Sequence, residues 1–314
     1  GMRNCRTTQE LVAGALGLEA SDILPASTGV IGAQLKMDLW EKAAPALAAN
    51  LGKATPEDFA RAIMTTDAFH KISHREVSLP GGVVKLVGMA KGAGMICPNM
   101  ATMLSVVLCD AQVEASVWQK MLRDAVELTF NRVTVDGDTS TNDTLYGLAN
   151  GASGVSASDE ESLKALSAAL TSVLGDLAYM LVKDGEGASK VARIHVTGAA
   201  SDADAERVAR TVGHSQLVKT ALYGRDANWG RIVAAVGRSG ADFNPDDVVV
   251  TLCGVELFRK GQPTDLDFDA LLEEPLKQRD LPIDIVLGSG SGSYTLLASD
   301  LGHEYVNVNA DYRS

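Results

Sequence analysis

The sequence predicts an α/β protein, and three patterns support that prediction. Short apolar runs rich in β-branched residues recur at residues 83–90, 103–108 and 191–196, and such runs are typical of buried strands. Between them lie segments with apolar residues at helical spacing, as around Trp118 and Leu122. Turns containing glycine or proline separate the two kinds of segment. Strands that alternate with helices favour an α/β fold.

Helix boundaries in the first part of the chain follow from capping patterns. Pro56 suits the first turn of a helix, and Thr55 before it is a good N-cap. Ser116 is expected to cap the next amphipathic helix. We therefore expect helices over residues 8–16, 36–49, from 56 onward and over 116–130, with strands over 83–90 and 103–108.

A long helix is expected to close this first part. Ser158 and Glu161 have the spacing of a capping box, and the apolar periodicity continues to Lys183. Gly185 then suits the C-cap.

The strand and helix pattern starts again at residue 191, so we expect two domains, residues 1–189 and residues 190–314. Residues 288–293 alternate glycine and serine after a strand, but another strand follows, so a hairpin turn is expected rather than a phosphate loop. The remaining elements are strands at 191–196, 248–253 and 283–287 and helices at 202–212, 226–236 and 267–277.

Composition limits the classes of function. The net charge of −12 argues against nucleic-acid or anionic-membrane partners. No apolar run approaches the roughly 20 residues of a membrane span, and Gly1-Met2 resembles a tag remnant with no signal segment after it, so the cytoplasm is the default compartment. The four cysteines form no C-x-x-C pair, and His70 and His74, though at helical spacing, lack a third ligand. We expect no metal site.

One stretch has the features of an N-terminal nucleophile. Residues 91–101 form a glycine-rich loop, and Thr102 opens the apolar run 103–108. Cleavage between Ala101 and Thr102 would give Thr102 a free α-amine, with a pKa of about 7.7 to 8.0, beside its own hydroxyl. Threonine is also common at strand starts, so the residues alone favour a structural role.

Other polar stretches admit both a structural and a functional interpretation. Thr28 and Gly29 lie in a glycine-bounded turn, which is a plain connection or a place where N–H groups approach a ligand. Thr65 ends an apolar helix, Lys91 precedes the glycine-rich loop and Glu186 lies between two glycines. Each of these three is ordinarily a solvated position.

Residues 131–144 are dense in short hydrogen-bonding side chains. Such residues cap helices and brace turns. A calcium loop is the alternative, but it lacks the closing glutamate.

Several motifs, in this order along the chain, resemble those of the ornithine acetyltransferase (ArgJ) family, which are bifunctional glutamate N-acetyltransferases. The resemblance runs from about Asn4 to Ser314. The motifs are STGVIG, TTD, KGAGMICPNMATML, FNRVTVDGDTSTNDT, DGEG, DANWGRI and the terminal NADYRS.

The resemblance implies a role for each matching residue. Thr102 is implied to be the nucleophile, freed by self-cleavage at Ala101–Thr102. Thr28 and Gly29 are implied to form the oxyanion hole, and Glu186 to move protons at the active site. The residues implied to contact substrate are Thr65, Lys91, Thr102, Glu186, Asn309 and Ser314; residues 131–144 are given a bracing role.

The resemblance also implies a fold, a reaction and an assembly. The fold is an N-terminal-nucleophile-like (DmpA/ArgJ-like) sandwich of sheets and helices, with a smaller α/β C-terminal domain. The reaction moves acetyl from N2-acetyl-L-ornithine to L-glutamate through an acetyl-threonine ester, in the cyclic pathway of arginine biosynthesis, without a cofactor and with acetyl-CoA as a second acetyl donor in bifunctional members. The assembly is a heterotetramer of two α and two β chains.

Two departures from the family leave alternatives open. Cys97 replaces the usual histidine of the cleavage loop. Family chains also begin well before Asn4 with strands that join the first sheet, so the N-terminal part of the nucleophile domain is expected to be truncated here. The alternatives are an amidohydrolase or aminopeptidase of the same nucleophile class, and an inactive truncated homologue.

Overall fold

The structure, a computed structural model, describes residues 1–97 and 103–311. Its α-helices are α1 (Met2–Leu16), α2 (Met37–Ala49), α3 (Pro56–Ala62), α4 (Ala115–Leu128), α5 (Glu160–Lys183), α6 (Asp202–Gly213), α7 (Gln216–Gly224), α8 (Trp229–Gly237), α9 (Phe268–Leu272) and α10 (His303–Asp311), with 3-10 turns at Ala20–Asp22, Phe130–Arg132, Pro245–Asp247 and Pro275–Lys277. Its strands are β1 (Lys71–Leu79), β2 (Gly82–Lys91), β3 (Leu104–Cys109), β4 (Val133–Thr134), β5 (Thr144–Ala149), β6 (Val191–Ala199), β7 (Val249–Leu252), β8 (Val255–Arg259), β9 (Gln262–Pro263), β10 (Asp280–Val286) and β11 (Gly292–Ser299).

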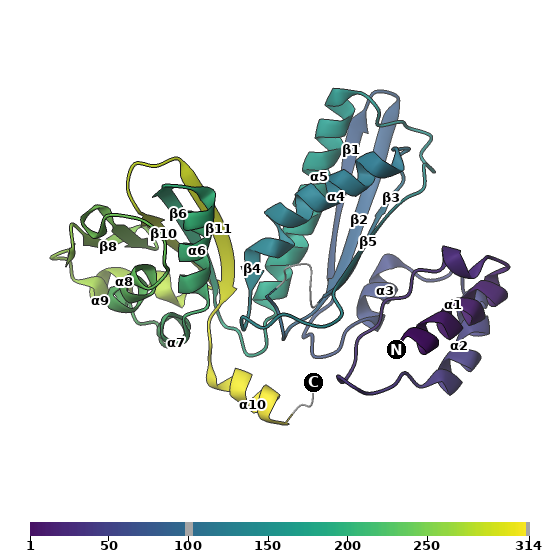
Figure 1. Cartoon of the computed structure of the whole chain (residues 1–314), viewed down its shortest axis with the longest axis horizontal. Helices are drawn as coiled ribbons and strands as arrows, with labels where there is room; N and C mark the ends of the chain where they lie inside the picture. Colours follow the sequence, from purple (N-terminus) through teal and green to yellow (C-terminus); the bar gives the residue numbers. More distant parts are fainter. Residues whose placement is uncertain (98–102, 312–314) are drawn as a thin grey trace.

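The first sheet has the order β1-β2-β3-β5, with antiparallel β1/β2 and β2/β3 pairs and a parallel β3/β5 pair. Helices α4 and α5 lie together against this sheet (Figure 1). The contact is close at Gly88 on β2, where an added Cβ would lie 2.6 Å from Val173 and 2.9 Å from Leu177 of α5. Glycine at this position therefore lets the central helix approach the sheet.

Helix α5 is the core helix of this part. Nine of its residues are buried, mostly leucines at helical spacing such as Leu166, Leu170 and Leu177. By length and composition it is also the one helix among the described residues that could cross a membrane, a test that core helices of this kind also pass. The opposite face of the sheet is more open, with Val83, Leu108 and others of its apolar side chains exposed.

The second sheet has the order β4-β11-β6-β10-β7-β8-β9. Its centre combines an antiparallel β11/β6 pair with a parallel β6/β10 pair. Helix α6 packs on β11 and β6, and Val208 and Val212 on its inner face are fully buried (Figure 1). The division expected at residue 190 falls just before β6.

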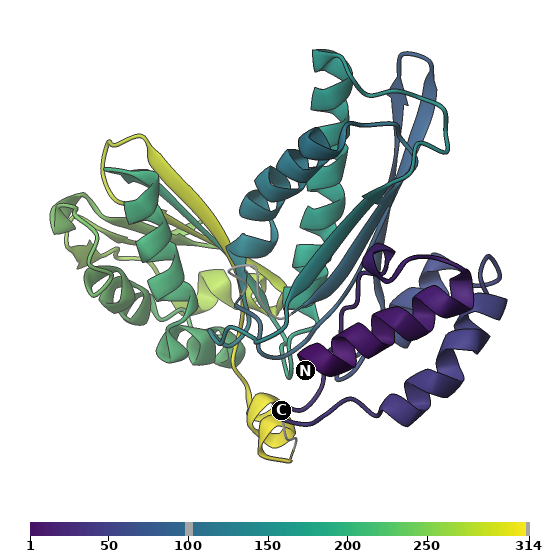
Figure 2. The same cartoon turned by 45° about the vertical axis from the view of Figure 1, so that its right-hand side comes forward.

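Strand β4 joins the two parts of the molecule. It lies between α4 and β5 in the sequence, yet it pairs with β11 at the edge of the second sheet, Val133 opposite Leu297. Figures 1 and 2 show β4 where the two parts meet, with α1 and α2 side by side at the far end of the first part. The chain thus crosses into the second sheet before returning to complete the first.

The α/β class is confirmed, whereas several local predictions are wrong. Strand β1 was not expected, because its buried side chains include Ser73 and the partly buried Arg75, which bind Asp176 of α5 instead of forming an apolar stripe. The N-cap of α4 is Glu114 rather than Ser116, since its carboxylate accepts the Val117 N–H.

Two further boundaries differ from the expectation. Asp159, not Ser158, caps α5 through the Ser162 N–H. The helix ends at Lys183, as expected, but its C-cap is Asp184 rather than Gly185. The region expected as one helix over residues 267–277 is the short α9 followed by a 3-10 turn.

Candidate active site

A cavity of about 320 Å³ lies beside the end of β2, and α10 forms part of its wall. Its walls come from the turn after residue 27, the segment after α3, the loop after β2, residues 136–142, the segment after α5, and α10. The lining contains six residues singled out from the sequence: Thr28, Gly29, Thr65, Lys91, Glu186 and Asn309. The predictions for Ala101, Thr102 and Ser314 fall outside the described residues.

Among the described residues that line this cavity, Lys91 is the cation. It is 6% exposed, and its Nζ donates to the Thr65 hydroxyl at 2.9 Å, so the end of β2 and the segment after α3 converge here. Burial lowers the pKa of Lys91, while the carboxylates of Asp67, Glu186 and others oppose this. A partly desolvated ammonium beside a hydroxyl suits the carboxylate of a small molecule.

Glu186 lines the same cavity as Lys91. Its backbone N–H donates to the Ala93 carbonyl at 3.0 Å, and its carboxylate accepts the Asn309 amide of α10 at 2.8 Å. The loop after β2 passes so close that a Cβ on Gly94 would lie 2.4 Å from the Glu186 carboxylate. Because Gly94 has no side chain, the Glu186 carboxylate can occupy this space.

Asp136 anchors the glycine-rich loop after β2 by hydrogen bonds to its backbone. Its carboxylate accepts the N–H groups of Met95 at 2.6 Å and Ile96 at 3.0 Å, and Met95 has the left-handed φ of 56°. Burial raises the pKa of Asp136 despite these hydrogen bonds. The Tyr305 hydroxyl of α10 lies 3.4 Å from the same carboxylate. Residues 131–144 thus brace this loop in the structure.

Asp143 immediately precedes β5, which pairs with the start of β3. The next residue, Thr144, donates its N–H to the Met103 carbonyl at 2.8 Å. Both carboxylate oxygens of Asp143 are buried without a hydrogen-bond partner among the described residues. Burial raises its pKa to about 7, and the Met103 N–H and the Lys91 ammonium oppose this only in part. Sequence reasoning treated Asp143 as a bracing residue and missed its raised pKa.

Cys97 packs against the second part of the chain. Its Sγ lies 3.5 Å from His214 Nε2, and burial raises the pKa of the thiol while burial also lowers that of His214. A buried thiol held neutral in this way is not an activated nucleophile.

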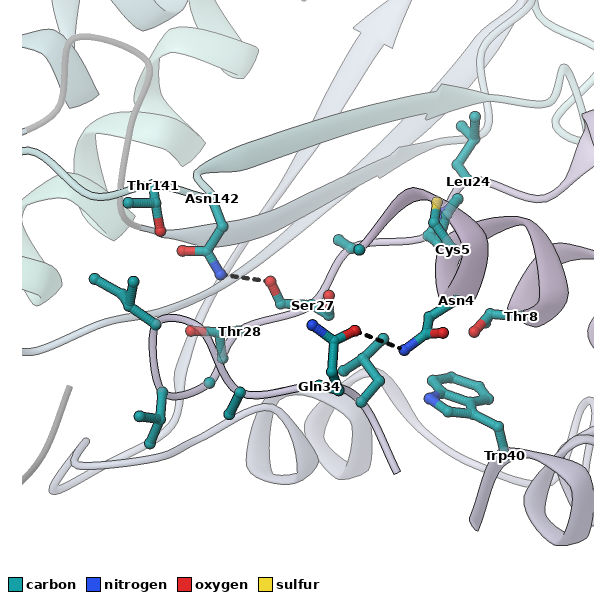
Figure 3. Close-up of a pocket in the computed structure, with 18 of the residues that line it drawn as sticks. Asn4, Cys5, Thr8, Leu24, Ser27, Thr28, Gln34, Trp40, Thr141 and Asn142 are labelled. Carbon is teal, nitrogen blue, oxygen red and sulfur yellow. Dashed lines mark hydrogen bonds between the residues drawn. The ribbon is translucent and has the colours of Figure 1, made fainter. Parts of the chain in front are cut away.

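A second cavity of about 620 Å³ adjoins the first (Figure 3). It lies between α1, α2 and residues 23–35, and it shares Thr28, Gly29 and the 141–142 segment with the first cavity. Asn142 of this segment donates to the Ser27 carbonyl at 2.5 Å, and Asn4 of α1 donates to Gln34 at 3.3 Å. The turn of Thr28 and Gly29 thus separates the two cavities.

The fold and the first cavity define a class: an α/β protein with a small polar cavity, suited to an amino-acid-like molecule, at the head of a central strand. The chain belongs to the ArgJ family, whose model matches residues 1–314.

The similarity to other proteins extends over the whole length of this chain. A protein of Nitratidesulfovibrio vulgaris named "Arginine biosynthesis bifunctional protein ArgJ" is 72% identical over 314 residues, covering 100% of this chain and 80% of the relative. A protein of the same name from Geobacter sulfurreducens is 45% identical over 316 residues, with the same coverages. The crystal structure of ArgJ from Bacillus halodurans matches with a TM-score of 0.62 and 36% identity, over 65% of this chain and 96% of that one. This chain therefore spans about four-fifths of the relatives' length.

Proposed function

We propose that this protein is an acetyltransferase of arginine biosynthesis that transfers acetyl from N2-acetyl-L-ornithine to L-glutamate, with Thr102 as its N-terminal nucleophile. The observation that carries the proposal is the meeting of Thr28, Gly29, Lys91 and Glu186 in one cavity near the anchored head of β3. Met103, the residue after Thr102, is fixed there by the Thr144 N–H. Membership of the ArgJ family and the names of the relatives support the same reaction.

The chemistry begins with self-cleavage. The Thr102 hydroxyl attacks the Ala101 carbonyl, the Ala101–Thr102 amide becomes an ester, and water hydrolyses that ester. The products are a carboxylate at Ala101 and a free amine on Thr102. That amine, with a pKa near 8, can then accept the hydroxyl proton of its own side chain.

Acetyl transfer then proceeds in two halves. The Thr102 oxygen attacks the acetyl carbonyl, and the oxyanion is stabilised by the Thr28 hydroxyl and the Gly29 N–H. The carbon–nitrogen bond breaks, ornithine leaves with a proton, and an acetyl-threonine ester remains. The amine of glutamate attacks this ester and restores the hydroxyl. Two acyl exchanges through an ester have lower barriers than one direct amide exchange.

The other groups of the cavity have distinct tasks in this scheme. Lys91 and Thr65 bind the α-carboxylate that both substrates carry. Glu186 helps to move one proton in each half: first from the Thr102 hydroxyl to the leaving amine of ornithine, and then from the incoming amine of glutamate back to the Thr102 oxygen. Asn309 holds the Glu186 carboxylate, and Ser314 is proposed as a further substrate contact.

The scheme needs no cofactor, and acetyl-CoA is proposed as the second acetyl donor because the relatives are named bifunctional. We further propose a heterotetramer of two α and two β chains, located in the cytoplasm. Light scattering on the purified protein measures the assembly.

Thr102→Ala tests the nucleophile. Denaturing gels should show two fragments for the wild type and one chain of 32.9 kDa for the variant, with acetyl transfer lost only in the variant. Wild-type protein is given N-acetylornithine with glutamate, then acetyl-CoA with glutamate, and N-acetylglutamate and free acetate are measured. Free acetate without N-acetylglutamate would assign a hydrolase instead. An uncut, inactive wild type would indicate an inactive homologue.

A further inference from the structure

A buried ionic triad lies beneath the candidate active site. Lys71 on β1 is 0% exposed, and its Nζ lies 2.6 Å from an Asp67 oxygen and 2.5 Å from an Asp184 oxygen. The side chains of the two aspartates are 0% and 2% exposed. The Phe69 ring covers the ammonium, with its centroid 5.1 Å from Nζ. None of the three residues lines the cavity.

Asp67 also binds the two chain segments that carry Lys91 and its partner Thr65. Its carboxylate accepts the Gly92 N–H at 2.6 Å and the Thr65 N–H at 3.0 Å. Gly92 follows Lys91, and Thr65 is the hydroxyl partner of Lys91. Fixing these two backbone groups therefore fixes the pair that we propose binds the substrate carboxylate.

Asp184 belongs to the segment that carries Glu186. It is the C-cap of α5, two residues before Glu186, and its carboxylate accepts the Ala68 N–H at 3.1 Å. Lys71 joins it to Asp67, so the wall that carries Glu186 is tied to the wall that carries Thr65 and Lys91.

Stability alone does not explain an ionic group at this place. Burying charges costs several kcal/mol per ion, and apolar residues of equal volume often stabilise a core as well or better. Burial by itself would raise the pKa of Asp67, but the Lys71 ammonium and the Gly92 N–H lower it. The carboxylate is thus held ionised, in the form that accepts N–H groups most strongly.

We propose that Asp67, Lys71 and Asp184 are positioning residues that set the separation between the carboxylate-binding pair Lys91 and Thr65 and the proton-transfer group Glu186. The inference rests on the proposed function, because it assigns those tasks to the cavity. The two arms of the triad hold different groups, so they should affect different kinetic constants.

The chain offers a matched control. Arg75 of β1 binds Asp176 of α5 at 2.7 Å, so this ion pair joins the same two elements as Lys71 and Asp184. Its side chains are 38% and 40% exposed, and neither residue lines the cavity. If Lys71→Met acted only by weakening the attachment of β1 to α5, Arg75→Met should therefore have the same kinetic effect.

The test compares Asp67→Asn, Asp184→Asn and Lys71→Met with Arg75→Met by steady-state kinetics with N-acetylornithine and glutamate. We expect Asp67→Asn to raise KM for both substrates at least tenfold with kcat within threefold. Asp184→Asn should lower kcat at least tenfold with KM within threefold, Lys71→Met should show both effects, and Arg75→Met should change neither more than twofold. Unfolding of part of the sample lowers kcat and leaves KM unchanged, so a raised KM identifies positioning by Asp67. For Asp184→Asn, kcat is calculated per folded molecule, with the folded fraction taken from its melting curve, so that a remaining tenfold loss identifies positioning.

The outcomes separate the two hypotheses. A wild type that transfers no acetyl overturns the proposed function. A wild type that transfers acetyl while Asp67→Asn keeps its KM, or while Arg75→Met loses as much as Lys71→Met, overturns the positioning role. If Lys71→Met does not fold, the two isosteric asparagine variants decide the question. Calorimetric titration with glutamate then measures binding without turnover, and Asp67→Asn should bind at least tenfold more weakly.

Discussion

At the scale of single residues, the site depends on what burial does to charged groups. Lys91, Asp136 and Asp143 are all partly buried, and burial shifts the pKa of each toward its neutral form. Asp136 is compensated by backbone N–H donors. Asp143 forms no hydrogen bond that meets the usual distance and angle among the described residues, and the nearby Met103 N–H offsets the effect of its burial only in part. It is therefore the residue at which stability should depend most clearly on pH.

Asp143→Asn should remove a pH-dependent loss of stability. The pKa of Asp143 rises from 3.8 to about 7 on folding, so the unfolded chain loses this proton at lower pH than the folded one. Stability is then fully present below pH 4 and falls as the pH rises to 7. This pKa shift corresponds to about 4 kcal/mol of the free energy of unfolding, and we halve this value to about 2 kcal/mol because the residue is partly exposed.

The measurement is the melting temperature at several pH values between 4 and 8. The asparagine adds a constant cost for an unpaired buried amide, so the slope decides and the absolute value does not. Relative to the wild type, Asp143→Asn should gain about 4 °C over this range. The exposed Asp265→Asn serves as control and should parallel the wild type. Parallel curves for Asp143→Asn would show that this carboxyl titrates normally.

At the scale of elements, α10 forms a wall of the site that is held by few contacts. None of its residues is buried. Its described polar contacts to the site are Asn309 with Glu186 and Tyr305 with Asp136. The helix therefore contributes little to stability and directly affects the position of the Glu186 carboxylate.

Asn309→Ala should affect catalysis without destabilising the fold. It removes a hydrogen bond to a charged group, worth about 1.5–3 kcal/mol, from Glu186. We expect kcat/KM to fall about tenfold or more and the melting temperature to stay within ~1 °C. Asn307→Ala on the same helix, which removes only an exposed contact with Glu304, should change neither. A melting temperature that falls with the activity would mean that α10 is structural.

The elements also show what the sequence can predict. Apolar runs such as those of β2 and β3, and the helical spacing of α5, were sufficient to predict these elements, because their side chains face one core. Strand β1 and helix α10 were missed, since polar partners from distant segments replace the apolar pattern: Asp176 binds Arg75, and Glu186 binds Asn309. N-caps were displaced by one or two residues because several adjacent side chains can accept the same N–H groups.

The same contrast holds for the candidate site. Glycine-rich and short polar motifs pointed to six residues that the structure gathers in one cavity. The triad was missed, because only Asp67 and Lys71 are near in sequence and Asp184 comes from 113 residues away. A contact of that range leaves no local pattern in a single sequence.

At the scale of the whole molecule, two buried cores share one chain path. The apolar cluster of the second part surrounds β6, β10 and α6, and that of the first part surrounds α5. Strand β4 belongs to the first part by sequence and to the second sheet by pairing. Arg210 of α6 reinforces this junction by donating to the Asn131 carbonyl at 2.8 Å and to the Tyr294 hydroxyl at 3.0 Å.

This junction should make unfolding cooperative across both parts. The second core cannot open without releasing β4, and release of β4 exposes Val133, which is 0% exposed in the first core. Calorimetry of the wild type should therefore give one transition rather than two. Arg210→Ala removes the junction contacts and should lower the stability by about 1–3 kcal/mol, broadening or splitting that transition. Arg207→Ala, which removes an ion pair with Asp204 within the same helix, should leave a single transition, because it weakens α6 without loosening the junction. Two resolved transitions in the wild type would mean that each core unfolds alone and that β4 does not couple them.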